Sequence, residues 1–175
     1  MKQVNNYFHK DDAQLNQQLQ QAIELREKGD ANQSRIIILK LLEQNPDHAF
    51  LNYQCAWSHD VLGEERTAVP YYEKAIQLGL EERNLEDALL GLGSTYRTLG
   101  EYEKSKSTFL KGIELFPDNK AIQVFYAMTL YNLKEHHQAM EILLKNLAET
   151  TNDADIQKFS RAITYYADKL DTSWE

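Results

Sequence analysis

The sequence is poor in the residues that build disulfides, tight turns and membrane spans. Its one cysteine, Cys55, excludes an internal disulfide framework and a zinc site built on several thiolates. Three prolines and seven glycines in 175 residues favour long helices over a loop-rich or all-β fold. No apolar run reaches the roughly 18 residues of a transmembrane helix, and the first residues lack the apolar stretch of a signal peptide. We therefore expect a cytoplasmic protein.

Clustered positive charge is also missing. The net charge is −8, and lysines and arginines do not gather anywhere along the chain. Nucleic-acid binding normally requires a basic face that displaces counterions from phosphates, and anionic membranes attract proteins in a similar way. The composition therefore predicts neither nucleic acid nor membrane as a partner, and the acidic balance favours solubility.

The chain contains an internal repeat. Its register is marked by four turn signals: Gly29-Asp30, Gly63-Glu64, Gly100-Glu101 and Lys134-Glu135. The steps between these turns are 34, 37 and 34 residues. Pro46 and Pro117 each follow their turn glycine by 17 residues, so a second kind of marker keeps the same phase. This agreement predicts repeated structural units.

Each unit has the pattern of two amphipathic helices. The first helix is expected to end at the turn glycine, which adopts the left-handed backbone that closes a helix. The second is expected to begin at the acidic residue, where negative charge favours a helix N-terminus. It should end before Asn45-Pro46 in the first unit and before Pro117 in the third.

The third unit has the fullest motif: Leu89, Leu92, Gly93, Tyr96, Ser105, Phe109, Gly112 and Pro117. This pattern resembles the tetratricopeptide repeat. Gly93 and Ser105 are small enough to let the two helices approach closely, and Tyr96 and Phe109 are expected to fill the surrounding space. The other units match the motif in part.

The resemblance implies an all-α fold, a right-handed superhelical stack of four helix-turn-helix units within a single domain, 1–175. The expected units span about 15–48, 49–82, 86–119 and 120–152. Apolar residues at three- or four-residue intervals predict one capping helix over 154–170. The overall pattern looks most like small bacterial members of the family.

In this family the first helix of each unit lines the concave side, where ligands usually lie. In the second unit, Phe50, Tyr53 and Trp57 follow one another at helical spacing on that helix. In the first unit the equivalent stripe is Leu19, Ile23 and Arg26. We predict an apolar and aromatic groove formed by Phe50, Tyr53, Gln54, Trp57, Leu90, Arg97, Phe125, Met128 and Tyr131.

Two other interpretations of these residues remain open. An aromatic stripe on a helix more often belongs to the core than to a binding site. Alternatively, the groove is filled by the N-terminal Tyr7-Phe8, by the tail that carries Trp174, or by a second copy of the chain.

The best-known subclass of the family grips C-terminal carboxylates of chaperones with lysine, asparagine and arginine. The corresponding positions here hold mainly Leu19, Ile23, Gln54 and Asp87. The clamp is therefore absent, and Arg97 alone offers a pairing group for a carboxylate.

Two side-chain pairs have the residue types of a catalytic or metal site, but their positions on the helices favour neither. Cys55 and His59 are spaced i, i+4, but both belong to the stripe expected to pack against the second helix, where a thiol is inert. His136 and His137 are adjacent, so they point about 100° apart on a helix and do not chelate one ion well. We predict no enzyme activity, no cofactor and no metal.

These observations predict a protein–protein interaction module that binds a peptide or helical segment of a partner in the groove. The alternative is a self-assembling structural protein, a homodimer formed through the groove or the C-terminal helix.

Overall fold

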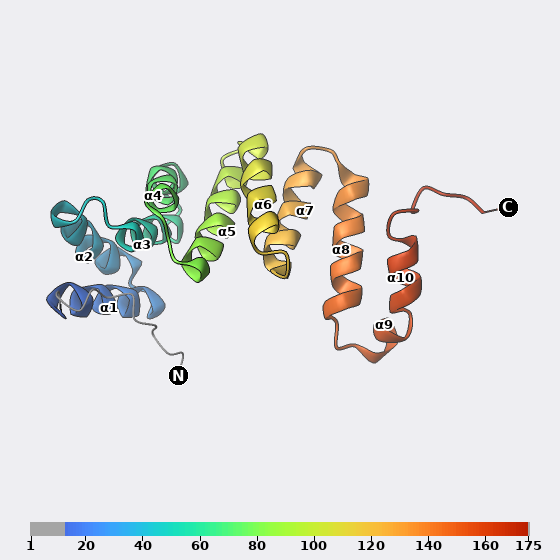
Figure 1. Ribbon diagram of the computed structural model, residues 1–175, viewed down its shortest axis with the longest axis horizontal. Helices are drawn as coiled ribbons and strands as arrows, with labels where there is room; N and C mark the ends of the chain where they lie inside the picture. Colours follow the sequence, from blue (N-terminus) through green and yellow to red (C-terminus); the bar gives the residue numbers. More distant parts are fainter. Residues whose placement is uncertain (1–12, 175) are drawn as a thin grey trace. The chain divides into compact units, whose positions relative to one another are not determined.

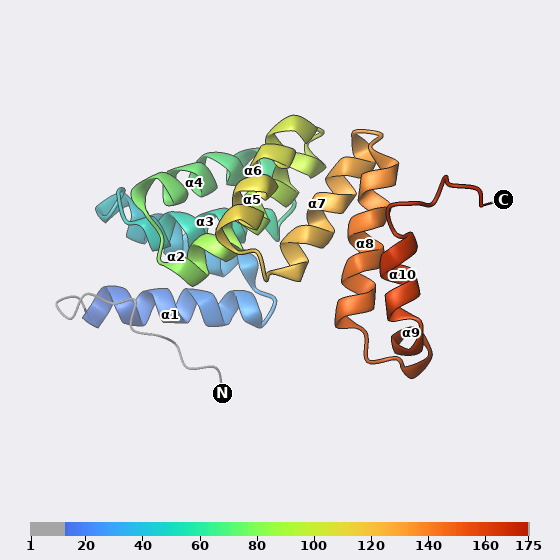
Figure 2. The ribbon, with the colours of Figure 1, turned by 45° about the vertical axis from the view of Figure 1, so that its right-hand side comes forward.

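The computed structural model describes residues 13–174, and within that range the regular structure is entirely helical. The helices, labelled in Figure 1, are α1 (Ala13–Glu27), α2 (Ala31–Gln44), α3 (Ala49–Asp60), α4 (Glu65–Leu78), α5 (Glu82–Thr98), α6 (Tyr102–Leu115), α7 (Lys120–Asn132), α8 (His136–Thr150), α9 (Ala154–Lys158) and α10 (Ser160–Tyr166). Within each unit successive helices pack together, α1 to α4 in the first and α6 to α8 in the second (Figures 1 and 2). The predicted all-α fold of consecutive helical hairpins is confirmed.

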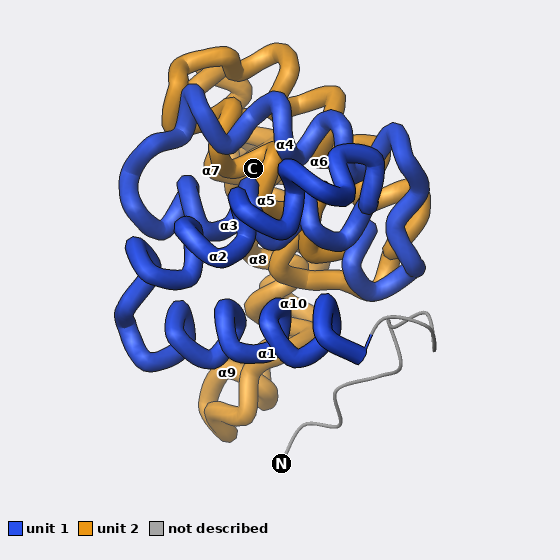
Figure 3. The backbone as a smooth tube through the Cα atoms, turned by 90° about the vertical axis from the view of Figure 1, so that its left-hand side faces the viewer, with its two compact units in different colours: residues 1–85 blue, residues 86–175 orange. Residues whose placement is uncertain are grey.

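The chain divides into two compact units, residues 1–85 and 86–175 (Figure 3). In unit 1, α1 packs against α2, α2 against α3, and α3 against α4. Its core contains Leu19, Ala22, Ile38, Leu41, Leu42, Leu51 and Cys55. In unit 2, α6 packs against α7, α7 against α8, and α8 against α10. The core of unit 2 contains Phe109, Ile122, Tyr126, Ala127, Leu130 and Ala139.

The four predicted turns close their helices in the same way. Gly29, Gly63 and Gly100 have φ values of +93°, +72° and +77°, and Lys134 reaches +66° at the fourth turn. Each of these residues donates its N–H to the carbonyl three residues earlier, and the next residue donates to the carbonyl five residues earlier. This pair of bonds satisfies carbonyls that the helix end would otherwise leave free.

Small side chains lie where the two helices of each hairpin meet. The second helices carry Ser34, Ala68, Ser105 and Ala139, and the first helices carry Ala22, Ala56, Gly93 and Ala127; all are buried. Ser105 Oγ donates a 2.7 Å hydrogen bond to the Gly93 carbonyl. A Cβ on Gly93 would lie 2.6 Å from ring atoms of Phe109, so any larger residue there requires the buried Phe109 ring to move. The predicted close contact between Gly93 and Ser105 is therefore present.

In two places a polar contact joins one hairpin to the next hairpin along the chain, and the two contacts occupy matching positions of the repeat. Ser34 Oγ lies 3.4 Å from Ser58 Oγ, and Ser105 Oγ lies 2.9 Å from Thr129 Oγ1; both pairs are 24 residues apart. The buried hydroxyls thus satisfy one another within the stack. The repeat in sequence is a repeat of contacts as well.

The C-terminal cap differs from the single helix expected over 154–170. Two short helices, α9 and α10, meet at Phe159, whose φ and ψ are −107° and 8°. The N–H of Phe159 donates to the Ile156 carbonyl three residues back, a tighter bond than that of an α-helix. The apolar spacing continues across this break, which is why the sequence pattern did not reveal it.

We expect Gly93→Ala to lower the free energy of unfolding by about 1–3 kcal/mol, because the added methyl group overlaps the Phe109 ring. In an uncrowded helix the same change stabilises by up to about 1 kcal/mol. Urea unfolding followed by circular dichroism measures the difference. Lys111→Ala, an exposed change on α6, serves as the control and should stay within about 0.5 kcal/mol. A more stable Gly93→Ala protein would contradict the close contact.

Candidate functional site

An aromatic row runs along α3 in unit 1. The ring centroids of Phe50 and Tyr53 are 6.0 Å apart, and those of Tyr53 and Trp57 are 5.9 Å apart. Tyr53 is only 3% exposed, whereas Trp57 is 41% exposed and Val61 follows it at 52%. The row therefore begins within the packed structure and ends at the surface with Trp57.

Arg26 of α1 holds the exposed end of this row in place. Its guanidinium carbon lies 4.1 Å from the centroid of the Trp57 ring, a cation–π contact. Nη1 donates to the Gln54 carbonyl at 3.2 Å and to Ser58 Oγ at 3.3 Å, and Nη2 donates to Gln54 Oε1 at 2.5 Å. Burial lowers the pKa of Arg26, although an arginine stays charged at neutral pH. The indole thus rests on a fixed cation.

A second candidate surface lies in unit 2, where a cavity of about 420 Å³ opens between α5, α7 and α8. It is lined by Arg97, Ala127, Met128, Tyr131, Asn132, His136, Ala139, Met140 and Leu143. Met128, Tyr131 and Met140 are all exposed, and Tyr131 is 64% exposed. Tyr131 and His136 lie with their ring centroids 4.6 Å apart at the mouth. We call this cavity the α7 pocket.

The predicted groove residues occupy different environments. Phe50, Tyr53, Gln54 and Trp57 belong to unit 1, and Leu90, Arg97, Phe125, Met128 and Tyr131 belong to unit 2. Tyr53 and Gln54 are buried, so they support Trp57 from beneath. Leu90 and Phe125 are partly buried against the core of unit 2, and Phe125 lies 6.4 Å from Phe109. The α7 pocket brings together the remaining three, Arg97, Met128 and Tyr131.

Tyr7 and Phe8, which were expected as one possible filling of the groove, lie outside the described residues.

Sequence reasoning missed the part of the α7 pocket that α8 contributes. Neither Met140 nor Leu143 was among the predicted groove residues, yet both line the pocket. Their apolar spacing on the second helix matches that of any buried residue. A reliable signal would have been the exposure of Met140, which is visible only once α7 and α8 are in place.

Cys55 and His59 do not form a nucleophile–base pair. Cys55 is buried, and its burial raises the pKa of the thiol to about 12, so almost no thiolate exists at neutral pH. The His59 ring instead stacks on Tyr71, with centroids 5.6 Å apart and planes 4° from parallel. The structure therefore gives this thiol no activated form.

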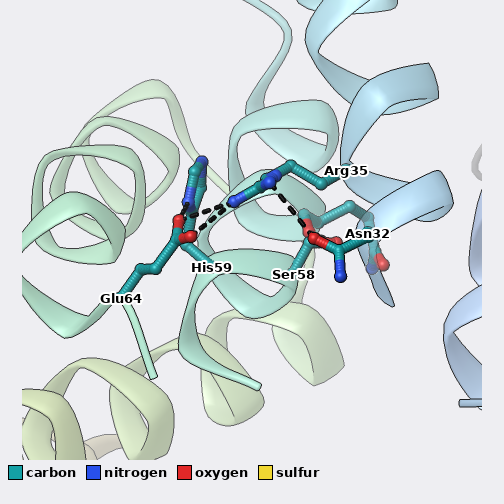
Figure 4. A network of polar contacts seen from close by, with 6 residues as sticks. Asn32, Arg35, Ser58, His59 and Glu64 are labelled. Carbon is teal, nitrogen blue, oxygen red and sulfur yellow. Dashed lines mark hydrogen bonds and ion pairs between the residues drawn. The ribbon is translucent and has the colours of Figure 1, made fainter. Parts of the chain in front are cut away.

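His59 takes part in a different polar network, shown in Figure 4. Its Nδ1 lies 2.6 Å from Glu64 Oε2, and Arg35 Nη1 donates to both oxygens of Glu64 at 2.6 and 2.7 Å. The bond from Arg35, and then that from His59, holds the pKa of Glu64 below its usual value. The network ties α2 and α3 to the start of α4. Lys106 pairs with Glu135 at the same 29-residue separation in unit 2.

The described part of the chain offers neither a metal cluster nor a membrane span. Residues 13–174 contain no group of three histidine, cysteine or acidic side chains arranged to hold a metal ion. His136, one of the two adjacent histidines, faces Tyr131 instead. Among the described helices, none combines the length and the apolar content that crossing a bilayer requires.

Comparison with known proteins agrees with this fold. A family model described as Tetratrico peptide repeat matches residues 49–170. Superkiller protein 3 of Saccharomyces cerevisiae is 28% identical over 94 residues, which are 54% of this chain and only 6% of that protein. The crystal structure of MamA protein matches with a TM-score of 0.69 at 17% identity and covers 85% of this chain and 76% of that one. YrrB matches with a TM-score of 0.60 at 17% identity, over 85% of each chain.

We expect the Arg35–Glu64–His59 network to make the free energy of unfolding depend on pH in the acidic range. Because the folded pKa of Glu64 lies below the usual 4.5, its contribution is present above pH 4.5 and is lost as the pH falls through the folded value. At pH 5 the wild-type chain should therefore unfold at a higher urea concentration than Glu64→Gln. The difference between the two urea midpoints should shrink as the pH falls toward 3. Glu65→Gln, a change at the neighbouring acid, is the control. A gap that stays constant down to pH 3 would exclude this role for Glu64.

Proposed function

Because this chain belongs to the tetratricopeptide repeat family, we propose that it is a protein-interaction module that binds an extended or helical segment of a partner polypeptide. Each unit has its own candidate surface of apolar and aromatic side chains on a first helix of a hairpin, α3 in unit 1 and α7 in unit 2. Repeats of this family are generally non-catalytic scaffolds, which agrees with the inert state of Cys55. YrrB, one of the structural neighbours, is described as a TPR protein with an unusual peptide-binding site.

The state of Trp57 is the observation that carries this proposal. A tryptophan that is 41% exposed leaves much of its ring in water, yet Arg26 fixes its position through the cation–π contact. Tryptophan and arginine are enriched among the residues that dominate binding energy at protein interfaces. Since Arg26 is itself held by Gln54 and Ser58, the ring loses little additional freedom when a ligand binds.

The free energy available at this site is enough for a specific contact. A tryptophan buries roughly 150–250 Å² in a core or interface, so the exposed part of Trp57 offers on the order of 100 Å². At about 25 cal/mol per Å², covering that area contributes about 2–3 kcal/mol. The α7 pocket of unit 2 adds a second place for an apolar side chain.

A second candidate function, self-association, is favoured by the aromatic surface of the C-terminal cap. Phe159, Tyr165, Tyr166 and Trp174 are all exposed, and Trp174 is 60% exposed. Tyr165, Tyr166 and Trp174 cluster with ring centroids 5.1–6.4 Å apart. Aromatic residues are enriched in protein interfaces and are costly to leave in water. Trp174 thus packs on tyrosines of α10, and the cluster offers a face to a second copy.

We expect Trp57→Ala to weaken peptide binding at least tenfold, because truncation removes the exposed part of the ring. The probes are twelve-residue peptides selected by phage display against the full chain, with dissociation constants measured by fluorescence anisotropy. Ile36→Ala, which removes another exposed apolar side chain of unit 1, should change the constant less than twofold. If no peptide is selected, or if neither Trp57→Ala nor Met128→Ala weakens binding, the interaction module is rejected.

Self-association through the cap predicts a dimer in sedimentation velocity at about 100 µM. Replacing Tyr165 and Trp174 together by serine should then convert the dimer to monomer, since the change removes most of the aromatic cluster. Exposed Leu110 on α6 provides the matched control, Leu110→Ser, which should leave the dimer intact. A wild-type chain that sediments as a monomer throughout the concentration range would exclude this second function.

A further inference from the structure

The α7 pocket combines an apolar interior with one cation. Its lining includes Met128, Met140 and Leu143, and none of its lining residues is acidic. Its volume of about 420 Å³ falls in the range of roughly 300–1,000 Å³ that is typical of ligand pockets. Methionine side chains are flexible and polarisable, so they adapt to apolar groups of different shape. The interior therefore suits one large apolar side chain.

Arg97 at the edge of this pocket lacks a counterion. Its Nη1 donates one hydrogen bond to Asn132 Oδ1 at 3.2 Å, and its buried Nε has no partner within the described range. Over residues 13–174, no carboxylate lies within ion-pair distance of this guanidinium. Several other cations of unit 2 do have a counterion, among them Lys106 with Glu135 and Lys145 with Glu141. A partly buried arginine with unused donors is a binding group for a carboxylate.

The helices around the pocket leave its α7 side uncovered. In unit 1, the α1–α2 hairpin is covered by α3, which contacts both of its helices. In unit 2, α10 packs against α8, and Met128 and Tyr131 of α7 remain exposed. The open surface thus has an apolar floor, an aromatic mouth and a cation at one edge.

We propose that the α7 pocket binds an acidic segment of a partner polypeptide, with a leucine, methionine or phenylalanine in the pocket and an aspartate or glutamate paired with Arg97. The two side chains of the partner lie within one helical turn of each other, because both Arg97 and Met128 line the same pocket. This inference rests on the proposed function and names the chemistry of the partner. The chain's surplus of negative charge does not oppose it, since that charge lies outside the pocket lining.

A charge-reversal experiment tests the pairing. Twelve-residue peptides selected by phage display on the full chain should be enriched in an acidic residue close to a leucine, methionine or phenylalanine. Arg97→Gln should weaken such a peptide 10- to 100-fold, as expected for a charge-assisted bond of about 1.5–3 kcal/mol. Replacing the acidic residue of the peptide by glutamine should cost the same factor on wild type and almost nothing on Arg97→Gln. Arg97→Glu should prefer the peptide with lysine at that position.

Matched variants distinguish a failure of this inference from a failure of the proposed function. Arg161→Gln, at an exposed arginine of α10, should change binding less than twofold. Met128→Ala removes an exposed side chain from the pocket and should weaken binding even if Arg97 variants prove unstable by circular dichroism. Peptides that depend on Trp57 but not on Arg97 or Met128 would overturn the inference and leave the interaction module standing. Absence of any selected peptide would reject both.

Discussion

Close contact between small residues is the constraint on which each hairpin depends. The small residues of the first helices and those of the second helices recur at the same sequence intervals along the chain. Every one of these residues is buried. Where the contact is tightest, at Gly93, a single added carbon would overlap Phe109. The aromatic and apolar side chains around it can only reach their partners when the two backbones approach this far. The functional surfaces follow from that geometry, since α3 and α7 each carry one of these small residues, and Ala127 and Ala139 themselves line the α7 pocket.

Much of the fold could be predicted from the sequence because its markers are local. A glycine with positive φ, an acidic residue after it and a proline beyond the second helix each act within a few residues. The turn at Lys134 was predicted by register alone, and it closes α7 with the same pair of hydrogen bonds as the glycine turns. The break at Phe159 could not be predicted, because apolar residues keep helical spacing through it.

The candidate site was less accessible to sequence reasoning. Tyr53 and Trp57 belong to one stripe, yet Tyr53 is buried and Trp57 is exposed. Tyr53 packs near Tyr72 of α4, whereas Trp57 lies against the guanidinium of Arg26 on α1. Such differences arise from side chains of neighbouring helices, which spacing along one helix does not encode. The pairing of Arg35 with Glu64 shows the converse case: its separation recurs in Lys106 and Glu135, so the repeat, once aligned, contains a signal for it.

The fourth turn has a consequence for the hairpin that carries the α7 pocket. Lys134 adopts a left-handed backbone without the freedom of glycine, which costs about 1 kcal/mol relative to glycine at the same place. The cost falls on the segment between Asn132 and His136, two residues that line the pocket. For equal packing this strain favours local opening of the hairpin over that of a hairpin closed by glycine, so we expect its amide protons to exchange with solvent sooner. The α7 pocket therefore borders a turn whose backbone strain a glycine would relieve.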